Sequence, residues 1–335
     1  MDYNIREIML NMKGYSFPYF FITICNLGVF DILYETKMTI SELAVILNIP
    51  QGLLIRLLRP LKAIKLIDFD DEVLAISLTD YGKIFSSKSD TNFLSRIKFH
   101  EKEGLIFWKS FEDKIQAVRS KNFERNNRFF EFSEDLEKTK LFINMMDSVS
   151  TGIDISEIIL KRIEVKNKHF VDIGGGVGTL TLKILSNIPQ LTATVYDLPH
   201  LENHTNLKIK EHGFENKCRF VSGDFFNTIP LGDFYLLSRV LHDWNDDECN
   251  LILSNIQSKM EHGQKLFILE RILPNGNEGK LEDYMRDLNV YCMCGGQERT
   301  IKEYDMLIKN NGLNILDVYD IDASSSLKCI EVCGV

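Results

Sequence analysis

From His169 to the end of the chain, short apolar runs alternate with amphipathic stretches, and this alternation limits the possible folds more than any other feature. The apolar runs, rich in β-branched and aromatic residues, predict strands at 169–173, 193–198, 218–226, 233–241, 264–273, 313–321 and 327–335. The stretches between them predict helices at 179–188, 203–213, 247–260, 281–293 and 301–312. This alternation implies an α/β fold with a doubly wound, mainly parallel sheet.

The beginning of the chain has a different pattern, in which two short helices precede a β-hairpin. Thr39 and Glu42 form a capping box that starts the first helix, and residues 53–64 predict the second. Residues 66–79 predict a hairpin with an acidic tip, so the whole order is typical of a winged-helix domain. A basic face on the second helix would suit DNA, and it consists of Arg56, Arg59, Lys62 and Lys65. The acidic hairpin tip and the net charge of -9 favour a packing module instead.

We expect three regions along the chain. A winged-helix-like dimerisation domain covers 1–90, a helical linker with aromatic, pocket-forming residues covers 91–160, and a Rossmann-like catalytic domain covers 161–335. The apolar stretch 15–30 is more than a short N-terminal segment should leave exposed, and it predicts a homodimer built by the N-terminal helices.

Composition excludes several classes of protein. The net charge of -9 weighs against nucleic acid or an anionic membrane as the main partner. No apolar window approaches ~18 residues and the N-terminus lacks a signal-peptide pattern, so we expect a cytoplasmic protein. Seven scattered cysteines without a Cys-x-x-Cys indicate reduced thiols. Cys292 and Cys294 could be proposed as metal ligands, but no matching pair stands nearby, so we expect packing in a helix and no metal.

A glycine-rich loop follows the first predicted strand of the α/β region. Gly174, Gly176 and Gly178 form G-x-G-x-G between a strand and a helix, where glycine lets a ligand approach the backbone. A dinucleotide fold is the rival interpretation, but its fingerprint wants Gly or Ala where Thr179 stands. Asp172, just before the loop, would repel a pyrophosphate, whereas it suits the ammonium and sulfonium of S-adenosylmethionine.

Two further acids follow the next two strands. Asp197 ends the second strand, where it can accept both ribose hydroxyls. Asp224 follows the third strand, where it can accept from an adenine amino group while Phe225 packs on the ring. Each acid alone could be a loop or cap residue. Acids at successive strand ends lie on one rim of such a sheet, which favours a ligand site.

The fourth predicted strand leads to His242 on the same rim, where a neutral imidazole can take a proton from a substrate hydroxyl. A histidine satisfied inside a loop is the alternative. Glu270 ends the fifth strand and Glu298 precedes a helix, and either carboxylate can orient the imidazole. The alternatives are a salt bridge of Glu270 with Arg271 or Arg239, and of Glu298 with Arg299.

Several segments, in order and spacing, resemble the metal-independent class I O-methyltransferases, which include caffeate, flavonoid and acetylserotonin enzymes and bacterial natural-product enzymes. These segments are VDIGGGVGTL, VYDLP, SGDFF, SRVLHDWNDDE, ILERILP and GGQERT, and the resemblance covers nearly the whole chain. It implies S-adenosylmethionine as cofactor, His242 as general base flanked by Glu270 and Glu298, and a winged-helix part that makes a dimer. Matching cofactor positions are Gly174, Asp197, Leu198, Gly223, Asp224, Phe225, Arg239, Met146 and Ser150, and we add Asp172, Gly176 and Ser238.

The sequence constrains the identity of the methyl acceptor less than that of the cofactor. Plant members tend to have Asn-Pro where Met293 and Cys294 stand, and this difference disfavours a phenylpropanoid acceptor. The abundance of Ile, Asn and Lys indicates an AT-rich microbial genome, which favours a bacterial phenolic or an aromatic polyketide of secondary metabolism. Candidate pocket residues are Phe99, Trp108, Asp243, Asn289 and Met293. An N-methyltransferase, a non-methylating homologue and a DNA-binding regulator remain as alternatives. A metal-dependent methyltransferase is a further one, because His200 and His204 are spaced i,i+4, although they also suit a solvated helix face.

Overall fold

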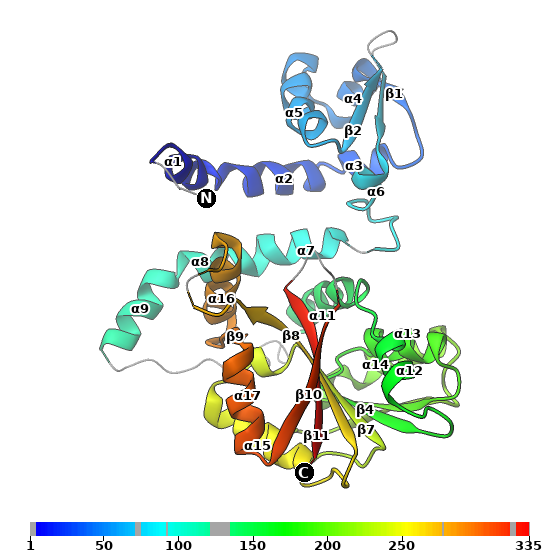
Figure 1. Cartoon of the computed structure of the whole chain (residues 1–335). Helices are drawn as coiled ribbons and strands as arrows, with labels where there is room; N and C mark the ends of the chain where they lie inside the picture. The colour runs from blue at the N-terminus through cyan, green and yellow to red at the C-terminus, as the bar shows by residue number, and fades with distance from the viewer. Residues whose placement is uncertain are drawn as a thin grey trace. The chain divides into compact units, whose positions relative to one another are not determined.

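The computed structural model describes residues 5–70, 75–91, 93–120, 135–276, 278–321 and 326–334 (Figure 1). The chain divides into two compact units, Met1–Leu105 and Ile106–Val335.

The N-terminal unit combines helices with a small antiparallel sheet of order β1-β3-β2. Its strands are β1 (Met38–Thr39), β2 (Ile67–Asp70) and β3 (Ala75–Leu78). Its helices are α1 (Ile5–Lys13), α2 (Ser16–Asn26), α3 (Val29–Ile32), α4 (Ile40–Leu47), α5 (Gln51–Ala63), α6 (Asp80–Lys83), α7 (Phe93–Phe99) and the π-helix η1 (His100–Gly104). The predicted helix-helix-hairpin order is confirmed, with β1 as an additional strand. Asp71 and Glu72 of the predicted acidic tip lie outside the described residues.

The predicted capping box is present, since the Thr39 side chain accepts from the Glu42 backbone and the Glu42 side chain accepts from the Thr39 backbone. The sequence predicts an apolar face on α5 made of Leu54, Leu57, Leu61 and Ile64, and most of it is buried. Leu54 and Leu61 are buried and Leu57 is partly buried against the same core, whereas Leu58 is buried in place of Ile64, which is 44% exposed. The spacing i, i+4, i+7 follows the helical period, and Ile64 lies beyond the end of the helix at Ala63.

Among the described residues, no single helix has the length and apolar character needed to cross a membrane. Helices α4 and α5 reach that length and apolar character only when they are counted together, and a bend of 108° separates them.

The C-terminal unit is built on one large sheet of order β10-β11-β8-β7-β4-β5-β6. Its strands are β4 (His169–Ile173), β5 (Thr192–Asp197), β6 (Cys218–Ser222), β7 (Phe234–Ser238), β8 (Lys265–Leu273), β10 (Leu313–Asp320) and β11 (Leu327–Gly334), and β9 (Arg299–Thr300) pairs with β8. The β6-β5-β4-β7-β8 pairs are parallel and β11 is antiparallel to both neighbours. The predicted α/β class and mainly parallel sheet are confirmed.

The helices of this unit are α8 (Leu105–Lys109), α9 (Phe111–Arg119), α11 (Leu136–Ser150), α12 (Ser156–Arg162), α13 (Thr179–Asn187), α14 (Glu202–Glu211), α15 (Asp246–Gln257), α16 (Leu281–Cys294) and α17 (Ile301–Asn310), with short 3-10 turns η2 (Pro199–Leu201) and η3 (Leu241–Asp243). Helices α12, α13 and α14 pack on one face of the sheet and α15 and α17 on the other, and the unit has further helices before β4 and after β8 (Figure 1). Side chains alternate along each strand, so Val171 packs with α15 and α17 while Phe170 packs with α12 and α13. Burial on both faces explains why the strands are continuously apolar.

The strand order creates a switch point at β4. The chain moves from β4 to β5 on one side and later to β7 on the other. Helices on opposite faces therefore diverge at the carboxyl ends of β4 and β7, and this crevice is where ligands bind in open α/β sheets.

Candidate active site

The glycine loop joins β4 to α13 and turns on left-handed backbone. Gly174, Gly176 and Gly178 have φ of 68°, 59° and 77°, a region that favours glycine. A Cβ at Gly174 would also lie 2.7 Å from a methyl carbon of Val240, so a side chain there would collide with the chain beyond β7. The loop thus leaves its backbone bare at the carboxyl end of β4.

Asp197, at the end of β5, holds this loop in place. Its Oδ2 accepts from the backbone N–H of Gly176 at 2.7 Å, and its Oδ1 accepts from the N–H of Leu198 at 2.7 Å. Burial raises the pKa of Asp197, and the two N–H bonds oppose that rise. Each carboxylate oxygen has a second lone pair, which leaves capacity to accept from ligand hydroxyls.

Asp172 lies beneath the loop and is 1% exposed. Its Oδ2 accepts from the Thr181 hydroxyl at 2.6 Å, while its Oδ1 has no hydrogen-bond partner among the described residues. Burial raises the pKa of Asp172 to about 7. An unpaired buried carboxylate oxygen is costly, and a cationic ligand beside it would remove that cost.

A cavity lies above these groups, and it is lined by every residue predicted to bind the cofactor. Its lining includes Met146, Ser150, Asp172, Gly174, Gly176, Asp197, Leu198, Gly223, Asp224, Phe225, Ser238 and Arg239. The structure adds residues that the sequence reasoning missed, among them Thr139, Phe142 and Asp147 of α11 and Trp244 beyond β7. The cavity contains about 1280 Å³ of space, part of which is open to solvent. An unpaired acid, a bare glycine loop and an acid at the end of β5 fit S-adenosylmethionine.

Arg239 and Asp224 are held by local contacts within this lining. Arg239 has a φ of 55°, and its N–H donates to the carbonyl of Leu269 at 2.8 Å. Its guanidinium donates to the Ser150 hydroxyl at 2.9 Å, which ties α11 to the chain after β7. Asp224 accepts from the N–H of Phe226 at 2.9 Å, so it also caps its own turn.

His242 lies on η3 and is paired with Glu270 of β8. The Nδ1 of His242 is 2.6 Å from Oε2 of Glu270, which is fully buried. The other oxygen, Oε1, accepts from the N–H groups of Val240 at 3.0 Å and Leu241 at 2.8 Å. Glu270 therefore binds both the imidazole and the backbone that carries it. The expected alternatives for Glu270, a salt bridge with Arg271 or Arg239, are not the contacts that hold this carboxylate.

The two acids beside His242 set its basicity. Burial alone would lower the pKa of His242, but the charges and hydrogen bonds of Glu270 and Asp243 raise that pKa well above 6.5. Asp243 Oδ1 is 3.3 Å from Nε2 of His242, and Asp243 also lines the cavity. The ring nitrogen not used by Glu270 is therefore next to Asp243, which lines the cavity, although His242 itself is not among the residues that line it.

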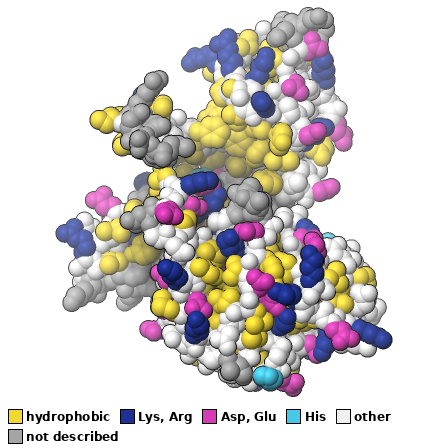
Figure 2. All heavy atoms as spheres, viewed as in Figure 1, with side chains coloured by type: hydrophobic (Ala, Val, Ile, Leu, Met, Phe, Trp, Pro, Cys, Tyr) yellow, Lys and Arg dark blue, Asp and Glu magenta, His cyan; other side chains and the backbone are white. Residues whose placement is uncertain are grey.

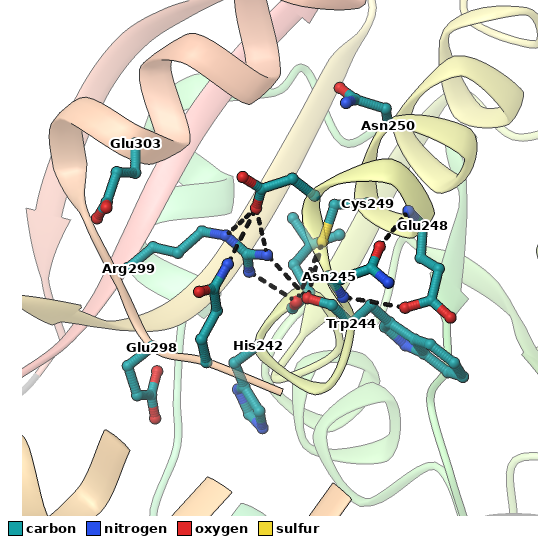
Figure 3. Close-up of polar contacts among 12 residues, drawn as sticks. His242, Trp244, Asn245, Glu248, Cys249, Asn250, Glu298, Arg299 and Glu303 are labelled. Atoms are coloured by element: carbon teal, nitrogen blue, oxygen red, sulfur yellow. Dashed lines mark hydrogen bonds and ion pairs between the residues drawn. The ribbon is translucent and has the colours of Figure 1, made fainter. Parts of the chain in front are cut away.

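Glu298 completes the group and projects toward the same side as His242 in Figure 3. Ligand atoms of His242, Glu270 and Glu298 all lie within 4.8 Å of one another. Glu298 Oε2 is buried without a hydrogen-bond partner among the described residues, and burial raises the pKa of Glu298 to about 7. The alternative pairing with Arg299 is not formed, because Arg299 pairs with Asp246.

This spacing could also hold a metal ion. Both oxygens of Glu270 are already committed, one to the Nδ1 of His242 and one to backbone N–H groups. These contacts favour a role for His242 as a base that Glu270 orients, and the absence of a metal stays a prediction.

The two cysteines considered as metal ligands, Cys292 and Cys294, are buried in α16, and Cys294 Sγ donates to the carbonyl of Val290 at 3.3 Å.

The residues predicted for the acceptor pocket are distributed more widely. Asp243 is at the site, and Met293 lies half-buried on α16. Asn289 is exposed on the same helix and accepts from the Trp108 indole N–H at 3.1 Å. Phe99 is buried in α7 of the N-terminal unit. His200, named for the metal-dependent alternative, lies on η2 and lines the cofactor cavity.

Residues 108–314 match the model of the O-methyltransferase domain family. This chain belongs to that family. It is 26% identical over 332 residues to the phenazine O-methyltransferase PhzM of Lysobacter antibioticus, covering 98% of this chain and 96% of that protein. It is also 26% identical to acetylserotonin O-methyltransferase of Gallus gallus, covering 91% of each. The human N-acetylserotonin methyltransferase structure in complex with SAM superposes with a TM-score of 0.83 at 22% identity, covering 99% of each chain.

Membership confirms the predicted resemblance, the methyltransferase form of the α/β fold with an N-terminal helical domain, and the enzyme class. The cofactor prediction is confirmed as well, since this family uses S-adenosylmethionine. The roles of individual site residues stay predictions, which the geometry above supports.

Asp197→Ala should weaken S-adenosylmethionine binding by about 1–3 kcal/mol, because it strands the N–H of Gly176 and removes two acceptors from the cavity. Isothermal titration calorimetry measures this change. Asp233→Ala is the matched control, since Asp233 binds the N–H of His169 at the opposite ends of the strands. Equal affinities for the Asp197 variant and the unmodified protein would remove Asp197 from the cofactor site.

Proposed function

We propose that this protein transfers a methyl group from S-adenosylmethionine to a hydroxyl of a small aromatic molecule, with His242 as the general base. The contact between Nδ1 of His242 and Oε2 of Glu270, beside the cavity, carries this proposal. When bound, the cofactor supplies an activated methyl group on a positive sulfur. The protein must then align an acceptor oxygen and remove its proton.

His242 can remove that proton through Nε2, because Nδ1 is occupied by Glu270. A buried carboxylate on Nδ1 fixes the tautomer and stabilises the imidazolium that forms. Glu298 adds a second carboxylate near the ring, and Asp243 connects the base to the cavity. A phenol has a pKa near ~10, so removal of its proton is needed at neutral pH.

The cavity supports an aromatic acceptor. Besides Phe225, which is assigned above to the adenine ring, Phe142, Phe226 and Trp244 line it. The rings of Phe226 and Trp244 pack edge to face with their centroids 4.7 Å apart. Such walls suit a flat, apolar ligand. The named relatives act on phenazine and acetylserotonin, both aromatic, which agrees with this class.

His242→Ala should lower kcat by about 10²–10⁴ while cofactor affinity stays nearly unchanged, because the variant loses the base but none of the cavity's cofactor-facing residues. A panel of phenolic acceptors with radiolabelled S-adenosylmethionine identifies the acceptor and gives kcat. His262→Ala, an exposed histidine, is the control, and excess EDTA should leave turnover unchanged. Near-normal turnover by the His242 variant on its true acceptor would refute general-base catalysis and favour an amine acceptor.

The pH dependence follows from the acids around His242. The neutral imidazole is the base, so kcat should rise with pH, and its midpoint should lie above 6.5 because Glu270 and Asp243 raise the pKa of His242. Glu270→Gln removes a negative charge and should move the midpoint to lower pH while also reducing kcat. Rate profiles across neutral pH test both shifts. A midpoint at or below 6.5, or one that the substitution leaves in place, contradicts this account.

The N-terminal unit provides the surface for a homodimer. Exposed apolar side chains gather on α1 and α2, and hydrophobic atoms lie over α2 in Figure 2. They include Ile8, Met9, Leu10, Met12, Tyr15, Phe17 and Tyr19. So large an apolar surface indicates a protein partner rather than nucleic acid. Light scattering at micromolar concentration should therefore give a dimer, whereas Phe17→Glu with Tyr19→Glu should give monomers. A monomeric unmodified protein would exclude this interface.

A further inference from the structure

Arg299 is a charged side chain with almost no contact with solvent. It is the first residue of β9, it is 1% exposed, and it pairs with Ile272 of β8. Removing a guanidinium from water is expensive unless its donors are all engaged. The hydrogen-bond acceptors of Arg299 therefore indicate its role in the structure.

Those acceptors all belong to the turn that carries His242 (Figure 3). Nη1 donates to the carbonyl of Leu241 at 3.0 Å, and Nη2 donates to the carbonyl of Trp244 at 2.8 Å. Nε and Nη2 both donate to Oδ1 of Asp246, at 3.0 and 2.7 Å. One planar side chain thus binds the residue before His242 and two that follow it.

The residues preceding Arg299 hold the same turn. The N–H of Gln297 donates to the carbonyl of His242 at 2.8 Å, and its side chain donates to Oδ1 of Asp246 at 3.0 Å. A Cβ at Gly296 would lie 2.1 Å from the carbonyl oxygen of His242, so only glycine allows this approach. The segment that ends in Arg299 is therefore shaped to the backbone of His242.

The turn is held from two directions with opposite chemistry. Glu270 accepts from the backbone N–H groups of Val240 and Leu241, and Arg299 donates to the carbonyls of Leu241 and Trp244. A fork of fixed donors can bind several carbonyls at once, which a lysine cannot do. Loss of Arg299 would remove the guanidinium from the carbonyls of Leu241 and Trp244, and the turn would keep Glu270, the N–H of Gln297 and the weaker thiol donor of Cys249.

We propose that Arg299 is a positioning residue for His242, fixing the turn so that the imidazole keeps its contact with Glu270. This inference rests on the proposed role of His242 as the base. Arg299 acts through the backbone of residues 241–246 and takes no part in proton transfer itself.

The test compares Arg299→Met and Arg299→Lys with the unmodified protein. Arg299→Met should lower kcat by about 10–100-fold, the scale of a small misplacement of a catalytic group. The KM values of acceptor and cofactor should change by less than about 3-fold, because Arg299 does not line the cofactor cavity. The kcat of Arg299→Lys should lie between those of Arg299→Met and the unmodified protein, since an ammonium can donate to only some of the oxygens that the guanidinium binds.

Nitrogen-15 NMR of histidine-labelled protein gives a readout that does not depend on turnover. The His242 signals are assigned by their absence in His242→Ala. In Arg299→Met the contact with Glu270 should loosen, so the pKa of His242 should fall. Loss of the arginine charge by itself would raise that pKa, so the direction of the change separates positioning from a simple charge effect.

Arg162→Met is the matched control, because Arg162 pairs with Asp317 of β10 and Glu331 of β11 and, among the described residues, has no such pair with the His242 turn. It should leave the His242 titration unchanged. Arg299→Lys keeps the positive charge, so a fall in the pKa of His242 in that variant reports positioning if Arg299→Met does not fold. An unchanged His242 titration in Arg299→Lys or in folded Arg299→Met would overturn the proposal.

The two hypotheses fail in different ways. If His242→Ala keeps its turnover, the base assignment fails whatever Arg299 does. If His242→Ala loses turnover while the Arg299 variants keep both turnover and the His242 titration, only the positioning role fails.

Discussion

The carboxylate of Glu270 is the interaction on which the rest of this site depends. A fully buried negative charge persists in a protein only when its oxygens are well supplied with donors. Here one oxygen has the imidazole of His242 and the other has the N–H groups of the turn that carries it. The charge cannot be satisfied without the turn, and the turn has no other acceptor for these N–H groups among its described contacts. The position of the His242 imidazole and the conformation of its turn are thus fixed by the same carboxylate.

The parallel sheet supplies the frame for this turn. β4, β5 and β7 end on one rim, so the glycine loop, Asp197 and the His242 turn come from distant parts of the chain to one crevice. Both faces of the sheet are covered by helices, which leaves the rim as the place where backbone groups can meet a ligand.

Much of this could be predicted from the sequence, for a physical reason. Strands and helices have fixed periods, and the carboxyl ends of parallel strands share one rim, so the amino-acid pattern alone places Gly174, Asp197 and His242 there. Contacts between loops leave no periodic pattern in the sequence. The approach of Gly296 to His242 and the unpaired oxygen of Asp172 depend on tertiary packing, which the pattern does not encode. Helix α5 likewise ends at Ala63, so Ile64 lies outside the apolar face that the pattern predicts for it.

Arg299 shows the same limit at a single residue. Its neighbour in the sequence, Glu298, is the partner that the pattern suggests for it. Its donors instead serve the carbonyl groups of Leu241 and Trp244, which are more than fifty positions away in the chain. Such a partnership arises only because β8 and β9 bring the two segments together.

The unpaired oxygen of Asp172 has a thermodynamic consequence. With a pKa of about 7 this carboxyl carries a proton in a large share of molecules near neutrality. A cation placed beside it stabilises the ionised form, so binding of such a ligand and release of that proton are linked events. Ligand affinity then increases as the medium becomes more alkaline, and heats of binding measured near neutrality include the ionisation heat of the buffer that takes up the proton.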